Sequence, residues 1–270
     1  MFNQSYKNII YQVVNQILEI KKTKKNLFCL LSGAQGSGKS TFANLIKKKL
    51  AKKKLKILVL SIDDFYYSKK DRFKLSKSIS PLLITRGVPG THDLANLQKV
   101  LKLFQQNKKI EYKLPLFSKA EDDLLNTKFH LLKFPYDIFI LEGWCVNYKG
   151  EKVNSLKKPI NQLEKLFDQS LRWRKYVNIK SKEYFKKIYI KSDCSILLKI
   201  PSFQYVFKFR KKQETTIPKK KQMSNQQLKK FISFYERITK NLLVSKKNDF
   251  DIHIIVKKNH NYSSLKKNIF

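Results

Sequence analysis

Short apolar runs recur along the chain, separated by segments with a different pattern. The runs cover residues 27–32, 57–61, 137–141, 195–200 and 252–256. Each has the length of a buried strand and is bounded by polar or turn-forming residues. Residues 39–50, 94–105, 163–190 and 203–213 instead repeat apolar positions at helical spacing. Because strands alternate with helices, the pattern predicts an α/β fold with a doubly wound, mostly parallel sheet.

The first two apolar runs are joined by a segment of helical pattern. A crossover of this length between two strands favours a parallel pair with the helix packed across it. The chain therefore predicts a strand, helix and strand unit over residues 27–61.

Both ends of the chain carry amphipathic helical patterns. Residues 1–22 have no continuous apolar stretch of the signal-peptide kind and predict a helix. Near the other end, Ser224 and Gln227 have the spacing of a capping box. Apolar residues then share one helical face, which predicts a single last helix: Leu228, Phe231, Ile232, Tyr235 and Ile238.

The section at residues 65–134 does not alternate so cleanly. It carries Pro81, Pro89, Gly90 and Pro115 in polar surroundings, and we interpret it as an insertion over the active edge of the sheet. The predicted organisation is an amphipathic helix at residues 1–26, followed by one domain at residues 27–270 with a lid and a substrate-binding insertion. No repeat or low-complexity linker interrupts it.

Composition bounds the class of protein less sharply than the pattern does. The 270 residues are 42% apolar, enough for a buried core, and carry a formal net charge of +38. The lysines are spread along the chain, so solvated helix faces explain the charge better than a specific nucleic-acid site does. The separated cysteines Cys29, Cys145 and Cys194 suggest neither a disulfide framework nor a zinc site. We expect a soluble cytoplasmic protein without a membrane span or a specific nucleic-acid partner, and the oligomeric state stays open.

A phosphate-binding pattern lies between the first strand and its helix. Residues 33–40, GAQGSGKS, fit G-x-x-x-x-G-K-[ST]. Backbone N–H groups of such a loop bind the phosphates of ATP, Lys39 would bridge the terminal phosphates, and Ser40 would ligate Mg²⁺. The alternative is a glycine-rich turn with an exposed lysine. The nucleotide-binding set is Gly33, Ala34, Gln35, Gly36, Ser37, Gly38, Lys39, Ser40 and Thr41.

Acidic residues follow two of the predicted strands. Asp63 and Asp64 follow the second strand, and Glu142 follows the strand at residues 137–141. Residues beyond the carboxyl ends of parallel strands share one edge of a sheet, where ligands bind. Phosphoryl transfer needs a group that takes the acceptor proton and carboxylates that hold Mg²⁺. Asp63 is the candidate base and Glu142 the candidate metal carboxylate, while Asp64 could assist either or cap a turn.

Several blocks of residues resemble the D-glycerate 3-kinase family. They are SIDDFY at 61–66, RGVPGTHD at 86–93, LEGWC at 141–145, RWRKYVN at 172–178, and the stretches 201–214 and 223–239. The resemblance covers nearly the whole chain from Leu27. Uridine kinase, phosphoribulokinase and bacterial pantothenate kinase are more distant relatives that share the loop. The resemblance implies a P-loop kinase fold, with ATP and Mg²⁺ as cofactors.

The resemblance also implies roles at single positions. Asp63 matches the aspartate that acts as base in the uridine-kinase relatives. Arg86 and His92 fall in the insertion that shapes the acceptor pocket, where a guanidinium could hold a carboxylate. Arg172 and Arg174 resemble lid arginines that stabilise the transferring phosphoryl group. The alternatives are a surface ion pair for Arg86, a helix-start residue beside a Thr91 or Asp93 cap for His92, and ordinary helix arginines for the other two.

One segment departs from the family pattern. Family members show an Asp-Lys-Ser-like segment after a proline and an aromatic residue, whereas this chain has Ser118-Lys119-Ala120 after Phe117. Lys119 is kept and can contact an anionic substrate, but the lost polar neighbours bear on acceptor specificity. The resemblance implies ATP-dependent phosphorylation of D-glycerate to 3-phosphoglycerate. A kinase for a nucleoside or another small alcohol, or a basic P-loop protein that binds nucleic acid, are the alternatives.

Overall fold

The computed structural model describes residues 4–215, 219 and 222–267. Residues 1–3 and 268–270, at the ends of the predicted domain bounds, lie outside the described residues. The chain divides into two compact units, described separately below. The first consists of Met1–Val59, Asp137–Asn147 and Ser192–Phe270, and the second of Leu60–Tyr136 and Tyr148–Lys191. The predicted insertion at residues 65–134 lies within the second unit.

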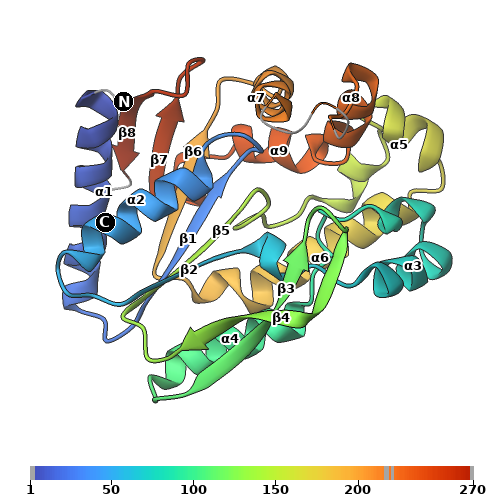
Figure 1. Cartoon of the computed structure of the whole chain (residues 1–270). Helices are drawn as coiled ribbons and strands as arrows, with labels where there is room; N and C mark the ends of the chain where they lie inside the picture. Colours follow the sequence, from blue (N-terminus) through green and yellow to red (C-terminus); the bar gives the residue numbers. More distant parts are fainter. Residues whose placement is uncertain (1–3, 216–218, 220–221, 268–270) are drawn as a thin grey trace. The chain divides into compact units, whose positions relative to one another are not determined.

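A six-stranded sheet with the order β2-β5-β1-β6-β7-β8 forms the centre of the first unit (Figure 1). Its strands are β1 (Leu27–Gly33), β2 (Ile57–Ser61), β5 (Ile138–Gly143), β6 (Cys194–Lys199), β7 (Ile252–Val256) and β8 (Tyr262–Lys267). The last two residues of β2 belong to the second unit. β1, β5, β6 and β7 pair in parallel, and β8 is antiparallel to β7. The predicted α/β class and mostly parallel sheet are confirmed.

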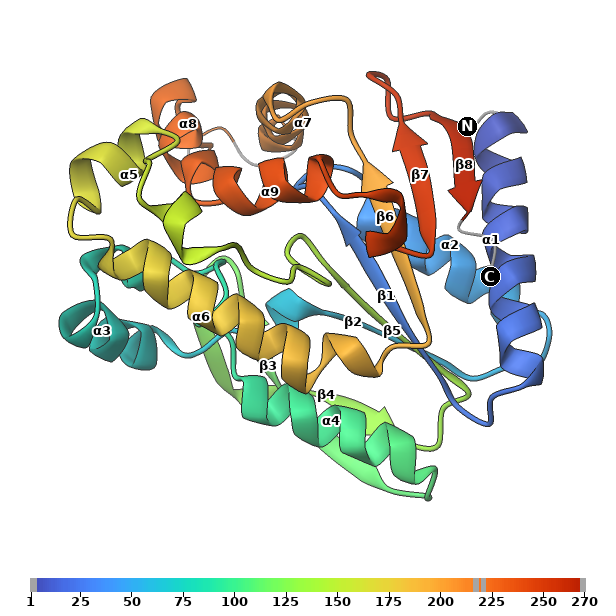
Figure 2. The same ribbon diagram turned by 180° about the vertical axis from the view of Figure 1, so that it is seen from behind.

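Helices cover both faces of this sheet. α1 (Gln4–Lys22) and α2 (Lys39–Ala51) lie on one side, and α9 (Glu236–Leu243) lies on the other (Figures 1 and 2). Successive side chains of β1 point to opposite faces of the sheet. Leu27 and Cys29 join the core beneath α1 and α2, whereas Phe28 stacks on Phe139 of β5. Burial on both faces explains why the strands read as continuous apolar runs rather than alternating ones.

The strand and helix unit predicted at residues 27–61 is present, but its two strands are not neighbours. β5 lies between β1 and β2 in the sheet. All six residues of β5 are buried, and a central position provides hydrogen-bonding partners on both of its edges. The chain reaches this position only after the excursion through residues 62–137, so local spacing could not indicate it.

Two of the predicted helices are broken. The segment at residues 163–190 forms α5 (Gln162–Phe167) and α6 (Arg172–Lys187). Leu171 has a left-handed φ of 62°, and the Asp168 carboxylate caps the new helix by accepting from the Trp173 and Arg174 N–H groups. The last helix is likewise α8 (Asn225–Ser233) followed by α9, although its predicted capping box between Ser224 and Gln227 is confirmed. α7 (Gln204–Glu214) matches its prediction within one residue.

Tyr235 lies at the second break, within the apolar face that was predicted to form one helix. Tyr235 separates α8 from α9 with φ −100° and ψ −10°. Its ring packs edge-on against Trp144, with 4.7 Å between the ring centroids, and also contacts Phe231. The Tyr235 side chain therefore packs at the junction between α8 and α9.

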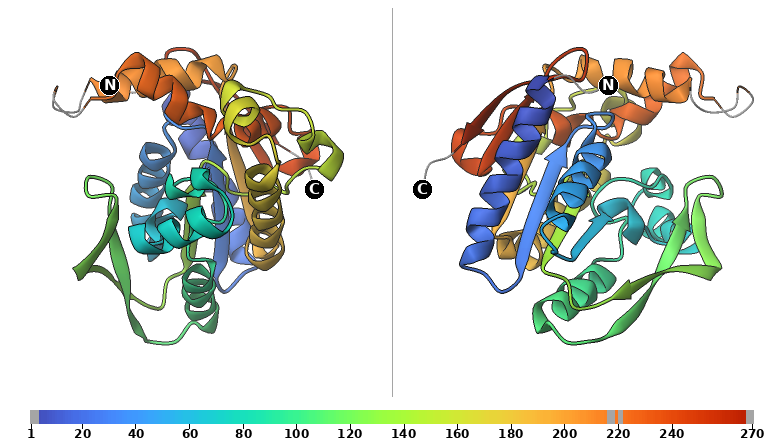
Figure 3. Two further views of the ribbon diagram at one scale, coloured as in Figure 1. Left: turned by 90° about the vertical axis from the view of Figure 1, so that its right-hand side faces the viewer. Right: turned by 60° about the vertical axis from the view of Figure 1, so that its left-hand side comes forward.

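The second unit contains helices and a two-stranded hairpin, drawn in green in Figure 3. Its helices are α3 (Lys69–Ser78), α4 (Leu94–Gln106), α5 and α6, and its antiparallel strands are β3 (Glu111–Ser118) and β4 (Asp123–Lys133). Short 3-10 turns occupy Ile62–Phe65, Pro81–Ile84, Val153–Leu156 and Tyr189–Lys191 here, and Lys247–Asp249 in the first unit. Asp93 caps α4 by accepting from the Asn96 N–H group. Among the described helices, none has the length and apolar composition needed to cross a membrane.

Candidate active site

The predicted phosphate-binding residues form a loop between β1 and α2. Gly36 and Gly38 adopt φ of 73° and 91°, which side chains rarely tolerate. A Cβ atom on Gly36 would also lie 2.6 Å from the Cβ atom of Phe209 on α7. Both the backbone conformation and the close approach of α7 therefore require glycine at this position.

The loop presents polar groups where an anion would bind. Lys39 opens α2, so its backbone stands at the positive end of the helix dipole, and its Nζ donates to the Ala34 carbonyl at 3.1 Å. The Ser37 hydroxyl is buried and has no hydrogen-bond partner among the described residues. An orphaned buried hydroxyl beside a helix N-terminus fits a phosphate oxygen. Thr41 lies exposed in the first turn of α2.

Ser40 and Glu142 meet as the metal prediction requires. Glu142 lies near the end of β5, where it is in register with Leu31 of β1. It is 6% exposed, and its Oε1 accepts a hydrogen bond of 2.6 Å from the Ser40 hydroxyl. A hydroxyl and a carboxylate are hard oxygen ligands, and Mg²⁺ usually takes only one or two protein oxygens and completes its shell with phosphates and water. These two residues fit Mg²⁺.

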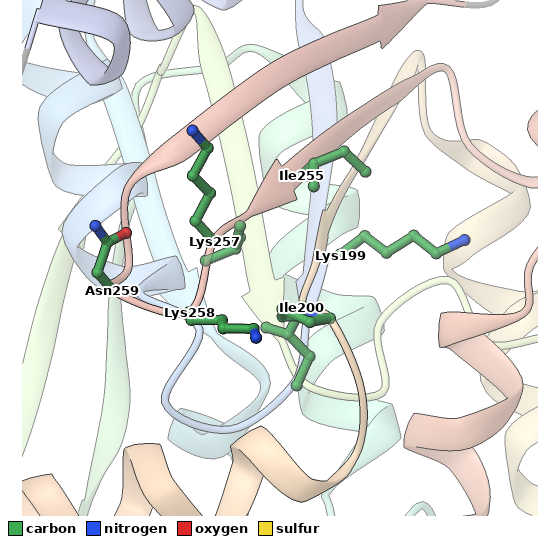
Figure 4. A pocket seen from close by; sticks show the side chains of 8 residues that line it. Lys199, Ile200, Ile255, Lys257, Lys258 and Asn259 are labelled. Carbon is green, nitrogen blue, oxygen red and sulfur yellow. The ribbon is translucent and has the colours of Figure 1, made fainter.

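A pocket of about 630 Å³ lies at the carboxyl ends of β6 and β7 (Figure 4). Gly33 of the phosphate-binding loop is in register with Leu198, the residue before the first that lines the pocket. The lining residues are Lys199, Ile200, Pro201, Ile255, Val256, Lys257, Lys258 and Asn259. None of these lining residues was predicted as a site residue, although Lys199 and Lys257 stand at or just after predicted strands, where ligands bind in parallel sheets.

The side chain of Asp63 accepts two hydrogen bonds within the second unit. The Tyr66 hydroxyl donates to its Oδ1 and the Lys119 ammonium to its Oδ2, each at 2.7 Å. Burial alone would raise the pKa of Asp63, but the Lys119 charge and the two hydrogen bonds outweigh it, so the pKa lies below its usual value. Asp63 is therefore ionised at neutral pH.

Asp64 has a different environment. Its Oδ2 accepts from the Ser61 backbone N–H at 2.8 Å, and the Ser61 hydroxyl in turn belongs to the same capping box of the 3-10 turn at Ile62–Phe65. This contact favours the turn-capping alternative for Asp64. The turn that Asp64 stabilises is the one that carries Asp63.

Arg86 is engaged by the turn between β3 and β4. Its guanidinium forms an ion pair with Asp122 and donates to the Lys119 carbonyl at 3.2 Å. Arg72, which is fully buried, also forms an ion pair with Asp122 at 3.1 Å. The ion pair considered for Arg86 is thus present. Its partner Asp122 could not be predicted from local pattern, because the two residues are 36 positions apart.

His92 is a buried aromatic neighbour of Tyr66. It is 1% exposed, stacks on the Tyr66 ring with 4.8 Å between centroids, and places Nδ1 3.2 Å from the Tyr184 hydroxyl. Its Nε2 has no hydrogen-bond partner among the described residues. Burial lowers the pKa of His92 to about 4, despite the opposing charge of Asp63, so the ring is neutral at pH 7.

The two predicted lid arginines differ sharply. Arg172 is exposed at the start of α6 and donates to the Ser78 carbonyl at 2.8 Å. Arg174 is 3% exposed, pairs with Asp168 at 2.8 Å, and donates to the Leu156 carbonyl. A buried guanidinium with these partners would have to leave all of them to reach a phosphate. Its contacts favour a structural role for Arg174.

Comparison with known proteins identifies relatives over most of the chain. A sequence model described as KAP family P-loop domain matches residues 6–244. The uncharacterized kinase mug58 of Schizosaccharomyces pombe is 30% identical over 223 residues, which make up 76% of each protein. The chloroplastic D-glycerate 3-kinase of Arabidopsis thaliana is 26% identical over 220 residues, 76% of this chain and 45% of that protein.

Solved structures include one with the same fold. The D-glycerate 3-kinase from Cryptococcus neoformans var. grubii matches with a TM-score of 0.79 at 20% identity, covering 96% of this chain and 99% of that chain. The P-loop fold and the resemblance to D-glycerate 3-kinases, both inferred from sequence motifs, are confirmed.

Proposed function

The chain belongs to the KAP family of P-loop domains, and we propose that it is a kinase that transfers the γ-phosphoryl group of ATP to D-glycerate, giving 3-phosphoglycerate. The observation that carries the proposal is the phosphate-binding loop with the hydrogen bond of 2.6 Å between Ser40 and Glu142. Two relatives named as D-glycerate 3-kinases support the choice of acceptor.

The first unit would bind the nucleotide. Backbone N–H groups of residues 33–41 and the Lys39 ammonium would hold the phosphates, and the pocket beside the loop has room for the base and ribose. Ser40 and Glu142 would hold Mg²⁺, which supplies charge neutralisation on the phosphates. Glu142 keeps the Ser40 hydroxyl oriented by accepting its hydrogen bond.

The second unit would supply the base. As the acceptor hydroxyl oxygen bonds to the γ-phosphorus, the bond from phosphorus to the bridging oxygen breaks and ADP leaves. The hydroxyl proton passes to the Asp63 carboxylate. Asp63 is suited to this step because it is ionised and because Tyr66 and the Asp64-capped turn fix its position.

Basic side chains near Asp63 would bind an acceptor with a negative charge. Lys119 reaches Asp63 directly, and Arg86 holds the backbone of the same turn. The carboxylate of D-glycerate is a natural partner for such a site. We also propose that His92, which supports the Tyr66 ring, shapes this site, and that Arg172 contributes to a lid. Another small hydroxylated metabolite with an anionic group is the alternative acceptor.

An acceptor panel tests the proposal. ADP release from ATP would be measured with D-glycerate, L-glycerate, uridine, pantothenate and ribulose 5-phosphate, and the product identified by mass spectrometry. We expect the highest kcat/KM with D-glycerate and formation of 3-phosphoglycerate. Lys39→Ala is the control that should abolish turnover. A higher kcat/KM with a neutral acceptor would make that acceptor, and not D-glycerate, the substrate. If no acceptor stimulates ADP release, the proposal of a small-molecule kinase is contradicted.

A further inference from the structure

The two hydrogen bonds to the Asp63 carboxylate come from side chains with very different freedom. Tyr66, which binds Oδ1, is 4% exposed and stacked on His92. Lys119, which binds Oδ2, has 63% of its side chain exposed. An exposed lysine has many rotamers, whereas a stacked buried tyrosine has few. Lys119 is therefore the partner that can leave.

The backbone beneath Lys119 is held while its side chain stays exposed. Arg86 binds the Lys119 carbonyl, and both Arg86 and the buried Arg72 bind Asp122 at the other end of the turn. These contacts anchor the turn between β3 and β4. Consequently, Lys119 can release Oδ2 by rotating its side chain, without any movement of the hairpin.

The Lys119 contact and the proposed reaction compete for the same oxygen. With Lys119 in place, Oδ2 already accepts a charge-assisted hydrogen bond, and the ammonium withdraws electron density from the carboxylate. Both effects make Asp63 a weaker proton acceptor, in agreement with its lowered pKa. Oδ1 is the less available oxygen, because the Tyr66 hydroxyl donates to it and the buried, stacked Tyr66 ring has little freedom to move away.

We propose that Lys119 is a charge-dependent gate on the base: it holds Oδ2 of Asp63 until a negatively charged group of the acceptor draws its ammonium away. The inference rests on the proposed kinase function and adds to it a mechanism by which the enzyme distinguishes charged from neutral acceptors. A carboxylate or phosphate on the acceptor exchanges one ion pair for another, so it opens the gate at little cost. A neutral alcohol, or water, offers the ammonium no such exchange, and Oδ2 remains blocked.

The gate would therefore suppress two side reactions, phosphorylation of neutral alcohols and hydrolysis of ATP by water. The size of the suppression follows from the fraction of time for which Lys119 occupies Oδ2. An ion pair of this exposure corresponds to a factor of about three to five.

The experiment compares acceptors that differ in charge. D-Glycerate and glycerol share a hydroxymethyl group beside a secondary hydroxyl, but only D-glycerate has a carboxylate. ATP turnover would be measured with D-glycerate, with glycerol and with no acceptor, for the wild-type chain and for Lys119→Met, which keeps much of the side-chain length without the charge. Lys133→Met is the matched control, because Lys133 pairs with Glu111 at 3.6 Å on the same hairpin.

The gate predicts changes of opposite sign in one variant. Lys119→Met should lower kcat/KM for D-glycerate by about 10²-fold, through loss of the carboxylate contact. The same variant should raise glycerol phosphorylation and acceptor-independent ATP hydrolysis by about three- to fivefold, because Oδ2 is freed. Lys119→Arg should keep the discrimination, and Lys133→Met should leave all three rates within about twofold of wild type.

Other outcomes overturn the gate in distinguishable ways. If Lys119→Met loses D-glycerate activity while the glycerol and water rates stay unchanged, Lys119 only binds the substrate. If all three rates fall together, its role is structural. In both cases wild-type turnover of D-glycerate leaves the proposed function standing. If no acceptor stimulates ADP release, the proposed function and the gate both fail.

Discussion

Ser40 and Glu142 are 102 positions apart in the chain, yet one hydrogen bond joins their side chains. The pairing of β5 with β1 produces this contact, because it brings the end of β5 beside the phosphate-binding loop. Neither side chain contributes to a hydrophobic core, and a buried carboxylate is costly unless it has a partner. Their position is consistent with the Mg²⁺ role that we propose.

The first prediction concerns Glu142. Glu142→Gln keeps the shape of the side chain but removes the negative charge, so we expect a raised Mg²⁺ requirement and a rate lower by about 10- to 100-fold. Steady-state kinetics across a magnesium titration measure both. Glu151→Gln is the control, since Glu151 also accepts a serine hydroxyl, that of Ser155 at 2.8 Å, in the second unit. An unchanged magnesium dependence would remove Glu142 from the metal site.

At this scale the sequence indicated residue types better than their partners. The P-loop pattern is local, so its residues and their place before a helix were predictable. The partners of three other predicted residues were not predictable, because each partner approaches only after the chain folds. The pairs are Arg86 with Asp122, His92 with Tyr184, and Arg174 with Asp168. Asp168 is near Arg174 in sequence, but it makes this contact only because the helix breaks between them.

At the scale of elements, the join between α5 and α6 is built around the buried Arg174 guanidinium and its two carboxylate partners. Asp168 caps α6 through two backbone N–H groups and also binds the Arg174 guanidinium, which reaches the carbonyl of Leu156. Glu164 of α5 lies 3.7 Å from the same guanidinium. The break that divides the predicted helix is thus stabilised by the arginine that follows it.

The second prediction concerns this cluster. Arg174→Met would leave the buried Asp168 without its cation, which costs about 3–5 kcal/mol when one member of a buried pair is lost. Urea unfolding measures the free energy, with Arg172→Met as the exposed control that should change it by about 0.5 kcal/mol or less. A stable Arg174→Met chain that has lost only catalysis would restore Arg174 to the lid.

The strands were predicted closely because each has a continuous apolar run, and all five predicted strand positions are occupied. The order of the strands in the sheet was not predicted, because β5 reaches its place between β1 and β2 through long-range pairing. The hairpin of β3 and β4 was also missed. Its exposed residues alternate weakly with buried ones, and Pro115 interrupts the pattern at a register shift.

At the scale of the whole molecule, the two units have different proposed roles. The phosphate-binding loop, Ser40 and Glu142 belong to the first unit, whereas Asp63, Tyr66 and Lys119 belong to the second. Nucleotide binding and proton acceptance should therefore respond separately to mutation. The net charge of +38 enters neither role, since the lysines are spread along the chain.

The most direct test of this division is Asp63→Asn, measured for ATP binding by calorimetry and for turnover with D-glycerate. We predict that kcat falls by about 10²- to 10⁴-fold, the range for a general base, while ATP affinity stays within about threefold of wild type. Asp64→Asn is the neighbouring control and should be milder, because Asp64 caps the turn through the Ser61 N–H. Near wild-type turnover by Asp63→Asn, with an inactive Asp64→Asn, would contradict the assignment of the base and exchange the two roles.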